Sequence, residues 1–293
     1  MALERGQSAC VLVHNSAVTT SKWIDRVWRQ LPSPARAMVR RGRHAWQRFS
    51  VLPADTLDAW RHPGRLLPPR SLRFVGDGDF ETIGTEFLHH FTSLAGLEPE
   101  HRVLDIDSGV GRMAVPLTTF LQPSARYDGF DIVGAGVAWC QQRITPRFPH
   151  FRFHYADVFN SRYNRSGRQQ ARDFRFPFGD ASVDFAFATS LFTHLLADDA
   201  HHYIREMARV LRPGGRCLCT FFLVNDDVAR RQREGHALLD FRFRRGDAWL
   251  ADEDVPENAV AYDERHVRAA YETNGLRVAS RSTRARGQDI RLQ

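Results

Sequence analysis

Residues 103–112 of this chain read VLDIDSGVGR, a short apolar run followed by a turn that holds Gly109 and Gly111. A glycine turn between a strand and a helix lets the backbone approach a ligand, and the helix start offers it free N–H groups. Asp107 stands where such a turn most often carries its first glycine. The stretch therefore predicts a nucleotide-like ligand and raises the question of whether the aspartate disturbs it.

The remainder of the chain alternates strands and helices around this turn. We predict strands over 102–106, 127–132, 151–156, 183–190, 216–224, 276–282 and 288–292. Helices are predicted over 81–94, 112–121, 137–147, 197–211 and 264–274. Strands separated by helices form a parallel, doubly wound sheet with right-handed crossovers, so the predicted fold class is α/β, Rossmann-like. Such a sheet binds ligands at the carboxyl ends of its strands.

Acidic or small polar residues stand at the ends of the first four strands: Asp105, Asp131, Asp157, Thr189 and Ser190. A carboxylate after the second strand, Asp131, can accept both hydroxyl groups of a ribose. Asp157, after the third strand, can accept from an adenine amino group, with Ile132 and Val158 against the faces of the ring. The strand ends therefore predict an adenosine pocket.

Five segments carry a resemblance to a known class of protein: VLDIDSGVGR, YDGFDI, FHYADV, FPFGDASVDFAFATSLFTHL and ARVLRPGGRCLCTFFL. In this order they make residues 81–293 resemble class I S-adenosylmethionine-dependent methyltransferases. ITPRFP, at residues 144–149, adds similarity to bacterial small-molecule methyltransferases. The resemblance implies a mostly parallel, seven-stranded sheet whose last strand, here 288–292, runs antiparallel. It also implies S-adenosylmethionine as the cofactor.

The resemblance further implies a role for each matching residue. The turn under the methionine part of the cofactor consists of Asp105, Asp107, Ser108, Gly109 and Gly111. Asp131 binds the ribose and Asp157 the adenine amino group, and Thr189 and Ser190 lie beneath the reaction centre. The cofactor's sulfonium makes its methyl group electrophilic, so the protein mainly aligns an acceptor atom for in-line attack.

His194 follows the fourth strand closely and is the candidate catalytic residue. Its imidazole titrates near neutral pH and can take the proton of an acceptor hydroxyl; alternatively, it only caps or packs at a helix start. The base role favours O-methylation of a small-molecule acceptor, a sugar or a secondary metabolite. We assign no metal, because the acidic and histidine residues of 198–202 fit a solvated helix start.

Two other interpretations stay open. Gly109, Gly111 and Ala114 also fit the GxGxx(G/A) pattern, and Asp131 follows about 20 residues later, as in nicotinamide-dependent oxidoreductases. The third candidate is a methyltransferase-like cofactor sensor or interaction protein whose turn has decayed at Asp107. A positive φ there would cost about 1–2 kcal/mol. The Asp107 carboxylate would repel the cofactor's carboxylate and attract its ammonium and sulfonium groups.

Two insertions leave the ligand-binding edge of the sheet, over 159–177 and 225–262. The second includes a predicted hairpin around residues 245–246. Loops at this edge usually close over ligands. Candidate acceptor-pocket residues are Tyr163, Phe241, Phe243 and Trp249.

The N-terminal region, 1–70, forms a basic extension that precedes the cofactor-binding domain, 71–293. It holds 12 Lys/Arg and 4 Asp/Glu, whereas the other 223 residues hold 29 and 30. We expect no element in residues 1–20, two helices within 23–49 and a proline-rich linker. The amphipathic helices either lie on an anionic membrane surface or cover the acceptor pocket, and we favour the cover because such a stripe usually faces a core.

Composition limits the classes of partner and the compartment. Apolar residues make up 43% and charged residues 26% of the chain, as in ordinary globular proteins. The domain after residue 70 lacks the basic excess of a nucleic-acid groove, and no apolar run approaches the roughly 20 residues of a membrane span. Four cysteines show no disulfide framework. We expect a reduced, cytoplasmic protein that binds a small molecule and no nucleic acid; its oligomeric state stays open.

Overall fold

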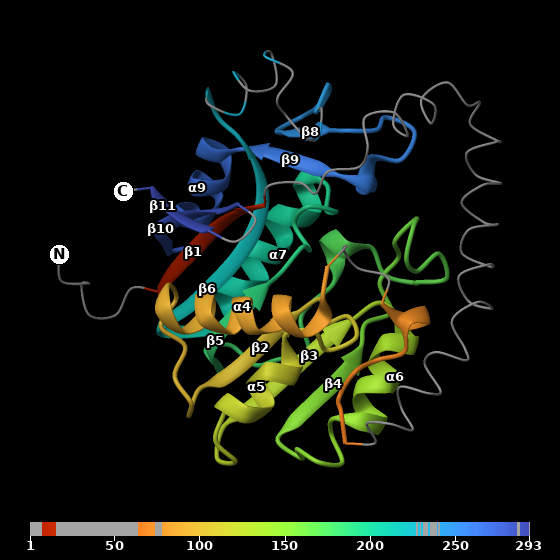
Figure 1. Ribbon diagram of the computed structural model, residues 1–293. Helices are drawn as coiled ribbons and strands as arrows, with labels where there is room; N and C mark the ends of the chain where they lie inside the picture. The colour runs from red at the N-terminus through yellow and green to blue at the C-terminus, as the bar shows by residue number, and fades with distance from the viewer. Residues whose placement is uncertain are drawn as a thin grey trace.

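The apolar runs after residue 80 become strands of one sheet in the computed structural model, which describes residues 8–15, 64–73, 78–226, 228, 230, 234, 239, 241–285 and 288–292. The strands are β1 (Ser8–Asn15), β2 (Arg102–Ile106), β3 (Arg126–Asp131), β4 (Phe151–Tyr155), β5 (Val183–Ala188), β6 (Leu211–Val224), β10 (Leu276–Ala285) and β11 (Gln288–Leu292). Their order is β11-β10-β1-β6-β5-β2-β3-β4, and the β10–β11 pair is antiparallel while the other pairs on this path are parallel. The predicted α/β class with an antiparallel last strand is confirmed (Figure 1).

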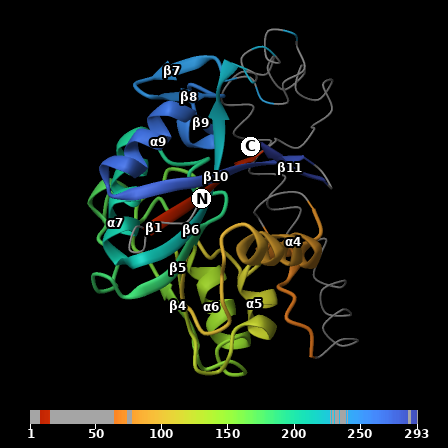
Figure 2. The same ribbon diagram turned by 90° about the vertical axis from the view of Figure 1, so that its left-hand side faces the viewer.

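Helices cover both faces of the sheet and bury its apolar side chains. On one face lie α4 (Phe80–Ser93), α5 (Ala114–Phe120) and α6 (Gly134–Arg143), and on the other α7 (Ala197–Val210) and α9 (Glu264–Thr273) (Figure 2). Short 3-10 turns occur at η1 (Arg70–Leu72), η2 (Ala171–Asp173) and η3 (Pro256–Asn258). The helix α4 begins where Asp79 accepts the N–H of Thr82, an N-cap that fixes the helix start. The described chain is thus a three-layer structure, with a core on each side of the sheet.

The strand β1 departs from the expectation that residues 1–20 carry no element, and that expectation is wrong. β1 pairs in parallel with both β6 and β10, so it adds an eighth strand to the seven predicted. Cys10 and Leu12 face the α7 and α9 side, Val11 and Val13 face the α4 side, and all four are at most 4% exposed. Residues 8–15 therefore belong to the sheet. The helices predicted within residues 23–49 lie outside the described residues.

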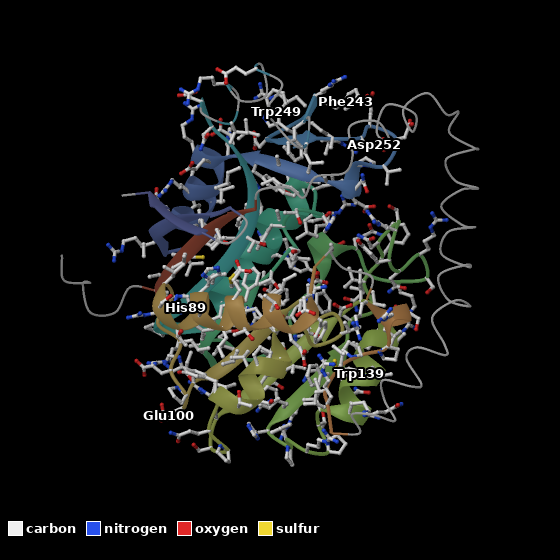
Figure 3. The ribbon with its side chains drawn as sticks, viewed as in Figure 1. His89, Glu100, Trp139, Phe243, Trp249 and Asp252 are labelled. Carbon is white, nitrogen blue, oxygen red and sulfur yellow. The ribbon has the colours of Figure 1, made fainter. Side chains whose placement is uncertain are left out.

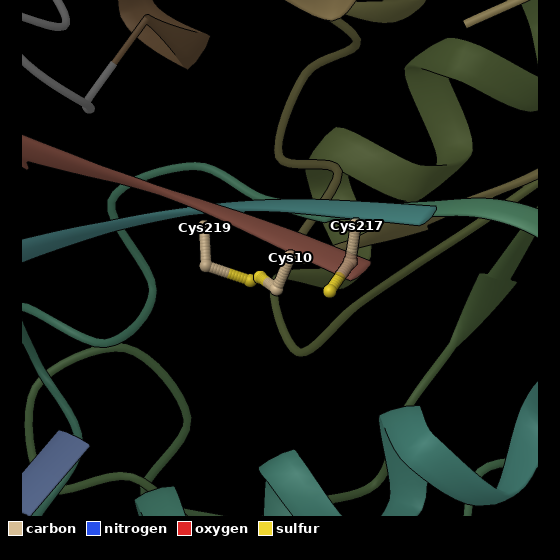
Figure 4. A group of neighbouring side chains, drawn as sticks. All are labelled: Cys10, Cys217 and Cys219. Carbon is tan, nitrogen blue, oxygen red and sulfur yellow. The ribbon is translucent and has the colours of Figure 1, made fainter. Parts of the chain in front are cut away.

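Three buried thiols join β1 to its neighbour (Figure 4). The Sγ atoms of Cys10, Cys217 and Cys219 lie within 4.8 Å of one another. The Sγ of Cys219 also lies 3.8 Å from the Sδ of Met207 on α7. Burial raises the pKa of the Cys10 and Cys217 thiols well above the ordinary value. All four cysteines of the chain are free, and the three clustered thiols pack as small apolar groups that close the contact of β1, β6 and α7.

A smaller strand group extends the end of β6. The strand β9 (Val260–Asp263) pairs in parallel with residues 222–224, and β8 (Ala248–Leu250) pairs with β9 and with β7 (Phe243–Arg245) in antiparallel fashion. The β7–β8 hairpin turns at Gly246, whose φ is +60°, so the predicted hairpin is confirmed. No helix within the described ranges is long and apolar enough to cross a membrane.

Leu12→Ala tests whether β1 is an integral strand. Leu12 is fully buried, so its truncation should lower the free energy of unfolding by about 2–5 kcal/mol in urea denaturation. Ser8→Ala, at the half-exposed start of the same strand, is the control; it removes only the hydrogen bond from the Ser8 hydroxyl to the Arg212 carbonyl and should change it by at most about 1 kcal/mol. Equal small effects of both substitutions would show that β1 is not part of the folded sheet.

Candidate functional site

A cavity opens at the carboxyl ends of β2, β3 and β5, the edge at which the sequence predicted the ligand. It encloses about 1120 Å³ of empty space, its open mouth included. Nine predicted residues line it: Asp107, Ser108, Gly109, Asp131, Ile132, Val158, Thr189, Ser190 and His194. The topology therefore brings most of the candidate site together, although these residues span about a third of the chain.

Asp131, at the end of β3, fixes the glycine turn that follows β2. Its carboxylate accepts the N–H of Gly109 at 2.6 Å and the N–H of Val133 at 2.6 Å. The N–H groups of Asp107 and Ser108 both donate to the carbonyl of Phe130 at 3.0 Å. Because these bonds run from one strand end to the next, the turn and the Asp131 carboxylate have a fixed relative position.

Asp107 adopts a φ of +77°, the region that glycine favours, so the strain expected from the sequence is present. Its carboxyl group shares a hydrogen bond with that of Asp131. Burial raises the pKa of Asp107 well above its ordinary value, and the charge of Asp131 raises it further. Burial also raises the pKa of Asp131, whereas the N–H groups of Val133 and Gly109 favour its charged form. These directions favour a protonated Asp107 beside an ionised Asp131.

Asp105 and Gly111 support the turn from outside the cavity lining. Asp105 is 1% exposed and accepts the hydroxyl of Tyr127 at 2.5 Å, and burial raises its pKa to about 8. Gly111 has a φ of +76°, and a Cβ there would come within 2.9 Å of Ile144 Cδ1. The glycine is thus required for close packing against the end of α6.

Asp157 is the predicted residue that the structure does not bring to the cavity. Its carboxylate forms an ion pair with Arg168, 2.5 Å from Nε, and this partner lowers the pKa of Asp157. Arg168 lies in the first insertion, eleven residues further along the chain. The adenine role of Asp157 stays a prediction that the observed pairing does not support.

Thr189 and Ser190 lie at the end of β5, where the backbone is again strained. Ser190 has a φ of +67°, its N–H donates to Thr220 Oγ1 at 2.7 Å, and its carbonyl accepts from Thr193 Oγ1 at 2.6 Å. These bonds hold a residue in a conformation that L-residues seldom adopt. The strand end therefore presents a fixed surface to the cavity.

His194 is held in one orientation by a backbone group that the sequence could not reveal. Its Nδ1 lies 2.9 Å from the carbonyl oxygen of Glu257, 63 residues away. A carbonyl only accepts, so Nδ1 carries the proton and Nε2 keeps its lone pair. Burial lowers the pKa of His194 below its ordinary 6.5, so the imidazole is neutral at pH 7. The geometry leaves Nε2 as a proton acceptor.

The two insertions contribute differently to the acceptor end of the cavity. In the first, Phe159, Asn160 and Tyr163 line the cavity, and the Tyr163 ring contacts His194 edge-on at 6.1 Å between centroids. Phe243 and Trp249 lie on the β7–β8 hairpin at one end of the molecule, outside the lining (Figure 3).

Phe241, the remaining acceptor candidate, also lies outside the lining and packs on Phe222 instead. Sequence reasoning missed Arg112, Leu191, Leu195 and Tyr203, which line the cavity too. Their helical or turn spacing gave no signal that separated them from core or surface positions.

Comparison with known proteins gives the same assignment for the central part of the chain. Residues 104–219 match the model of the family described as methyltransferase domain. Methyltransferase GfsG of Streptomyces halstedii is 32% identical over 148 residues, 47% of this chain and 45% of that protein. The 27-O-demethylrifamycin SV methyltransferase of Amycolatopsis mediterranei (strain S699) is 31% identical over 49% of this chain and 47% of that protein.

A third relative is the phthiotriol/phenolphthiotriol dimycocerosates methyltransferase 1 of Mycobacterium ulcerans (strain Agy99), 31% identical over 44% of this chain and 40% of that protein. The chain thus spans less than half the length of the curated relatives it matches. Residues 104–219 thus match a methyltransferase domain, and S-adenosylmethionine is the cofactor of the class I methyltransferases that the sequence resembles. The dinucleotide interpretation finds no support in these matches.

The residues present fit this cofactor. The cavity offers a carboxylate at the end of β3, backbone N–H groups at the turn and apolar walls from Ile132 and Val158. The Oγ of Ser108 and the Oδ1 of Asp105 are buried and have no hydrogen-bond partner within the described part of the chain. A polar ligand at the turn would supply a partner for the Ser108 hydroxyl, which belongs to a lining residue, whereas Asp105 lies outside the lining.

Asp105→Asn tests the burial of the carboxyl group beneath the turn. The folded protein holds the Asp105 proton up to about pH 8, whereas its ordinary pKa is 3.8. Between these values folding retains a proton, so the free energy of unfolding falls as pH rises, by up to about 1.4 kcal/mol per pH unit. The free energy of unfolding of the variant, measured by urea denaturation, should decline less steeply between about pH 6 and about pH 8.

The control for that measurement is Asp157→Asn. The pKa of Asp157 is lowered by Arg168, so its charge is the same in the folded and unfolded states above pH 6, and the slope should match that of the unmodified protein. An unchanged slope in Asp105→Asn would mean that the buried carboxyl is ionised at neutral pH.

Proposed function

We propose that the protein transfers the methyl group of S-adenosylmethionine to a hydroxyl oxygen of a small-molecule acceptor. The observation that carries this proposal is the neutral imidazole of His194, whose Nδ1–H is held by the Glu257 carbonyl while Nε2 is a base in the cavity. The names of the relatives support a small-molecule acceptor, one of them through an O-demethylated substrate.

We propose a methyl acceptor that is largely apolar around its reacting hydroxyl group. Next to His194, the cavity is lined by Phe159, Tyr163, Leu191 and Leu195, while the charged residues of the lining lie at the turn and at the end of β3. Apolar walls gain free energy from burying apolar surface, at roughly 25 cal/mol per Å². A secondary metabolite with a hydroxyl group fits this lining better than a bare sugar does.

When bound, the cofactor supplies an electrophilic methyl group on a sulfonium. The chain's own residues then position and deprotonate the acceptor. Asp131 would hold the ribose through its carboxylate oxygens, and the turn at Gly109 would approach the cofactor through its backbone. His194 Nε2 would take the proton of the acceptor hydroxyl, and the Glu257 carbonyl would stabilise the resulting imidazolium through Nδ1–H.

A second candidate function is a cofactor-binding sensor without turnover, which the strained Asp107 and its carboxyl partner favour. The two candidates differ in one observable. Incubation with S-adenosylmethionine and hydroxylated apolar compounds, read by mass spectrometry, gives a product heavier by one methyl group only for the enzyme. A protein that binds the cofactor and methylates none of them while the cofactor remains intact behaves as the sensor.

Asp131→Ala should weaken S-adenosylmethionine binding at least about tenfold, because a buried ribose loses both acceptors. The control is Glu98→Ala, which removes an exposed acidic residue before β2, away from the cavity lining, and should change the dissociation constant by less than about threefold. Isothermal titration calorimetry measures both. Equal affinity in Asp131→Ala and the unmodified protein would remove Asp131 from the cofactor site.

His194→Ala should lower kcat for methyl transfer by about 100-fold or more and leave cofactor affinity within about twofold. Because the neutral form of His194 is active and burial lowers its pKa, the rate should fall only below pH 6.5. The exposed His201 provides the control, and His201→Ala should keep both the rate and the pH profile. A loss of less than about threefold in His194→Ala would assign the imidazole a packing role.

A further inference from the structure

We propose that Asp107 discriminates the cationic methyl donor from its neutral thioether product: its carboxyl group donates to Asp131 in the free protein and ionises against the donor's positive charge when the cofactor binds. This inference rests on the proposed ribose contact of Asp131. It gives a functional role to an aspartate at a position that glycine would occupy without backbone strain.

The first step of the argument is the place of the Asp107 proton. Asp131 accepts two backbone N–H groups at 2.6 Å, which favour its charged form, whereas the only side-chain hydrogen bond described for Asp107 is with Asp131. Of the two carboxyl groups, Asp107 is therefore the one that carries the proton. The pair has one negative charge, located on Asp131.

The second step is competition for the lone pairs of Asp131. A carboxylate offers about four acceptor positions, and here the N–H groups of Gly109, Val133 and Ile132 and the carboxyl group of Asp107 all compete for them. The hydroxyl groups of a ribose must displace one of these partners. The contact with Asp107 is the one that can yield, because the others belong to the backbone.

The third step is the charge of the ligand. S-adenosylmethionine carries an ammonium, a carboxylate and a sulfonium, a net +1, and S-adenosylhomocysteine lacks the sulfonium charge. When Asp107 releases Asp131 it faces the cavity, where a nearby positive charge favours its ionised form. The proton leaves to solvent. Binding of the donor is thus coupled to the release of about one proton, and binding of the product to the release of less.

Other ionisable groups surround this pair. Asp105 lies beneath the turn, Tyr163 and Tyr203 face the pair from the first insertion and from α7, and Arg112 and His194 line the same cavity. Burial raises the pKa of Asp105 to about 8 and lowers the pKa of His194, so both groups contribute their own pH dependence to binding. A comparison that changes only the residue at position 107 separates its contribution from theirs.

The test is calorimetric titration of the unmodified protein, Asp107→Asn and Asp107→Gly with S-adenosylmethionine and with S-adenosylhomocysteine. The amide of Asp107→Asn keeps a donor toward Asp131 and cannot ionise, and asparagine tolerates positive φ. Asp107→Gly removes the side chain and relieves the strain, so it folds even where the first variant does not. Buffers of different ionisation enthalpy give the number of protons released.

For the unmodified protein, the affinity for S-adenosylmethionine should rise with pH over the range in which Asp107 is protonated in the free protein, by up to about tenfold per pH unit. Its preference for S-adenosylmethionine over S-adenosylhomocysteine should rise along with it. Both variants should lose most of this slope, release fewer protons and bind the two ligands with a ratio that does not change with pH.

Two results overturn the inference in different ways. If the unmodified protein binds S-adenosylmethionine and its pH slope, proton release and ligand ratio equal those of both variants, Asp107 plays no part in discrimination and the proposed cofactor site stands. If the unmodified protein binds neither ligand, the proposed site fails and the inference fails with it.

Discussion

The Asp131 carboxylate, which accepts the N–H groups of Gly109 and Val133 at 2.6 Å, is the contact on which the site depends. It ties the turn after β2 to the end of β3, and hydrogen bonds of this charged kind contribute about 1.5–3 kcal/mol each. Because the turn is fixed, Asp107 lies against Asp131 and the cavity wall has one shape. The carboxylate thus has a structural role as well as the ligand role that we propose for it.

The strained backbone and the buried carboxyl groups of the site lower the free energy of unfolding, and the packing around them maintains them. Asp107 and Ser190 both have positive φ, and Asp105 is buried with a pKa raised to about 8. Strain and buried carboxyl groups of this kind persist only where the surrounding structure determines them, and they gather at functional sites. Here they lie at the ends of β2 and β5, on either side of the cavity. Their position supports a binding site at this edge and not a purely structural one.

The sequence predicted the parts of the molecule that depend on local pattern. The alternation of strands and helices gave the α/β fold, and residues at strand ends such as Asp131 and Thr189 were placed correctly at the cavity because parallel strands end at one edge. Contacts between distant segments were not predictable. β1 is a short strand with a five-residue apolar run that resembles a frayed terminus. Arg168 pairs with Asp157 outside the cavity lining, and the Glu257 carbonyl fixes His194 from 63 residues away.

A crystal structure of the protein with S-adenosylhomocysteine tests the central claim most directly. The account predicts both ribose hydroxyl groups within about 3 Å of the Asp131 carboxylate, the Gly109 and Val133 N–H groups still bound to it, and Asp107 turned away from it. A ribose bound elsewhere, with Asp107 and Asp131 still hydrogen-bonded to each other, would contradict it.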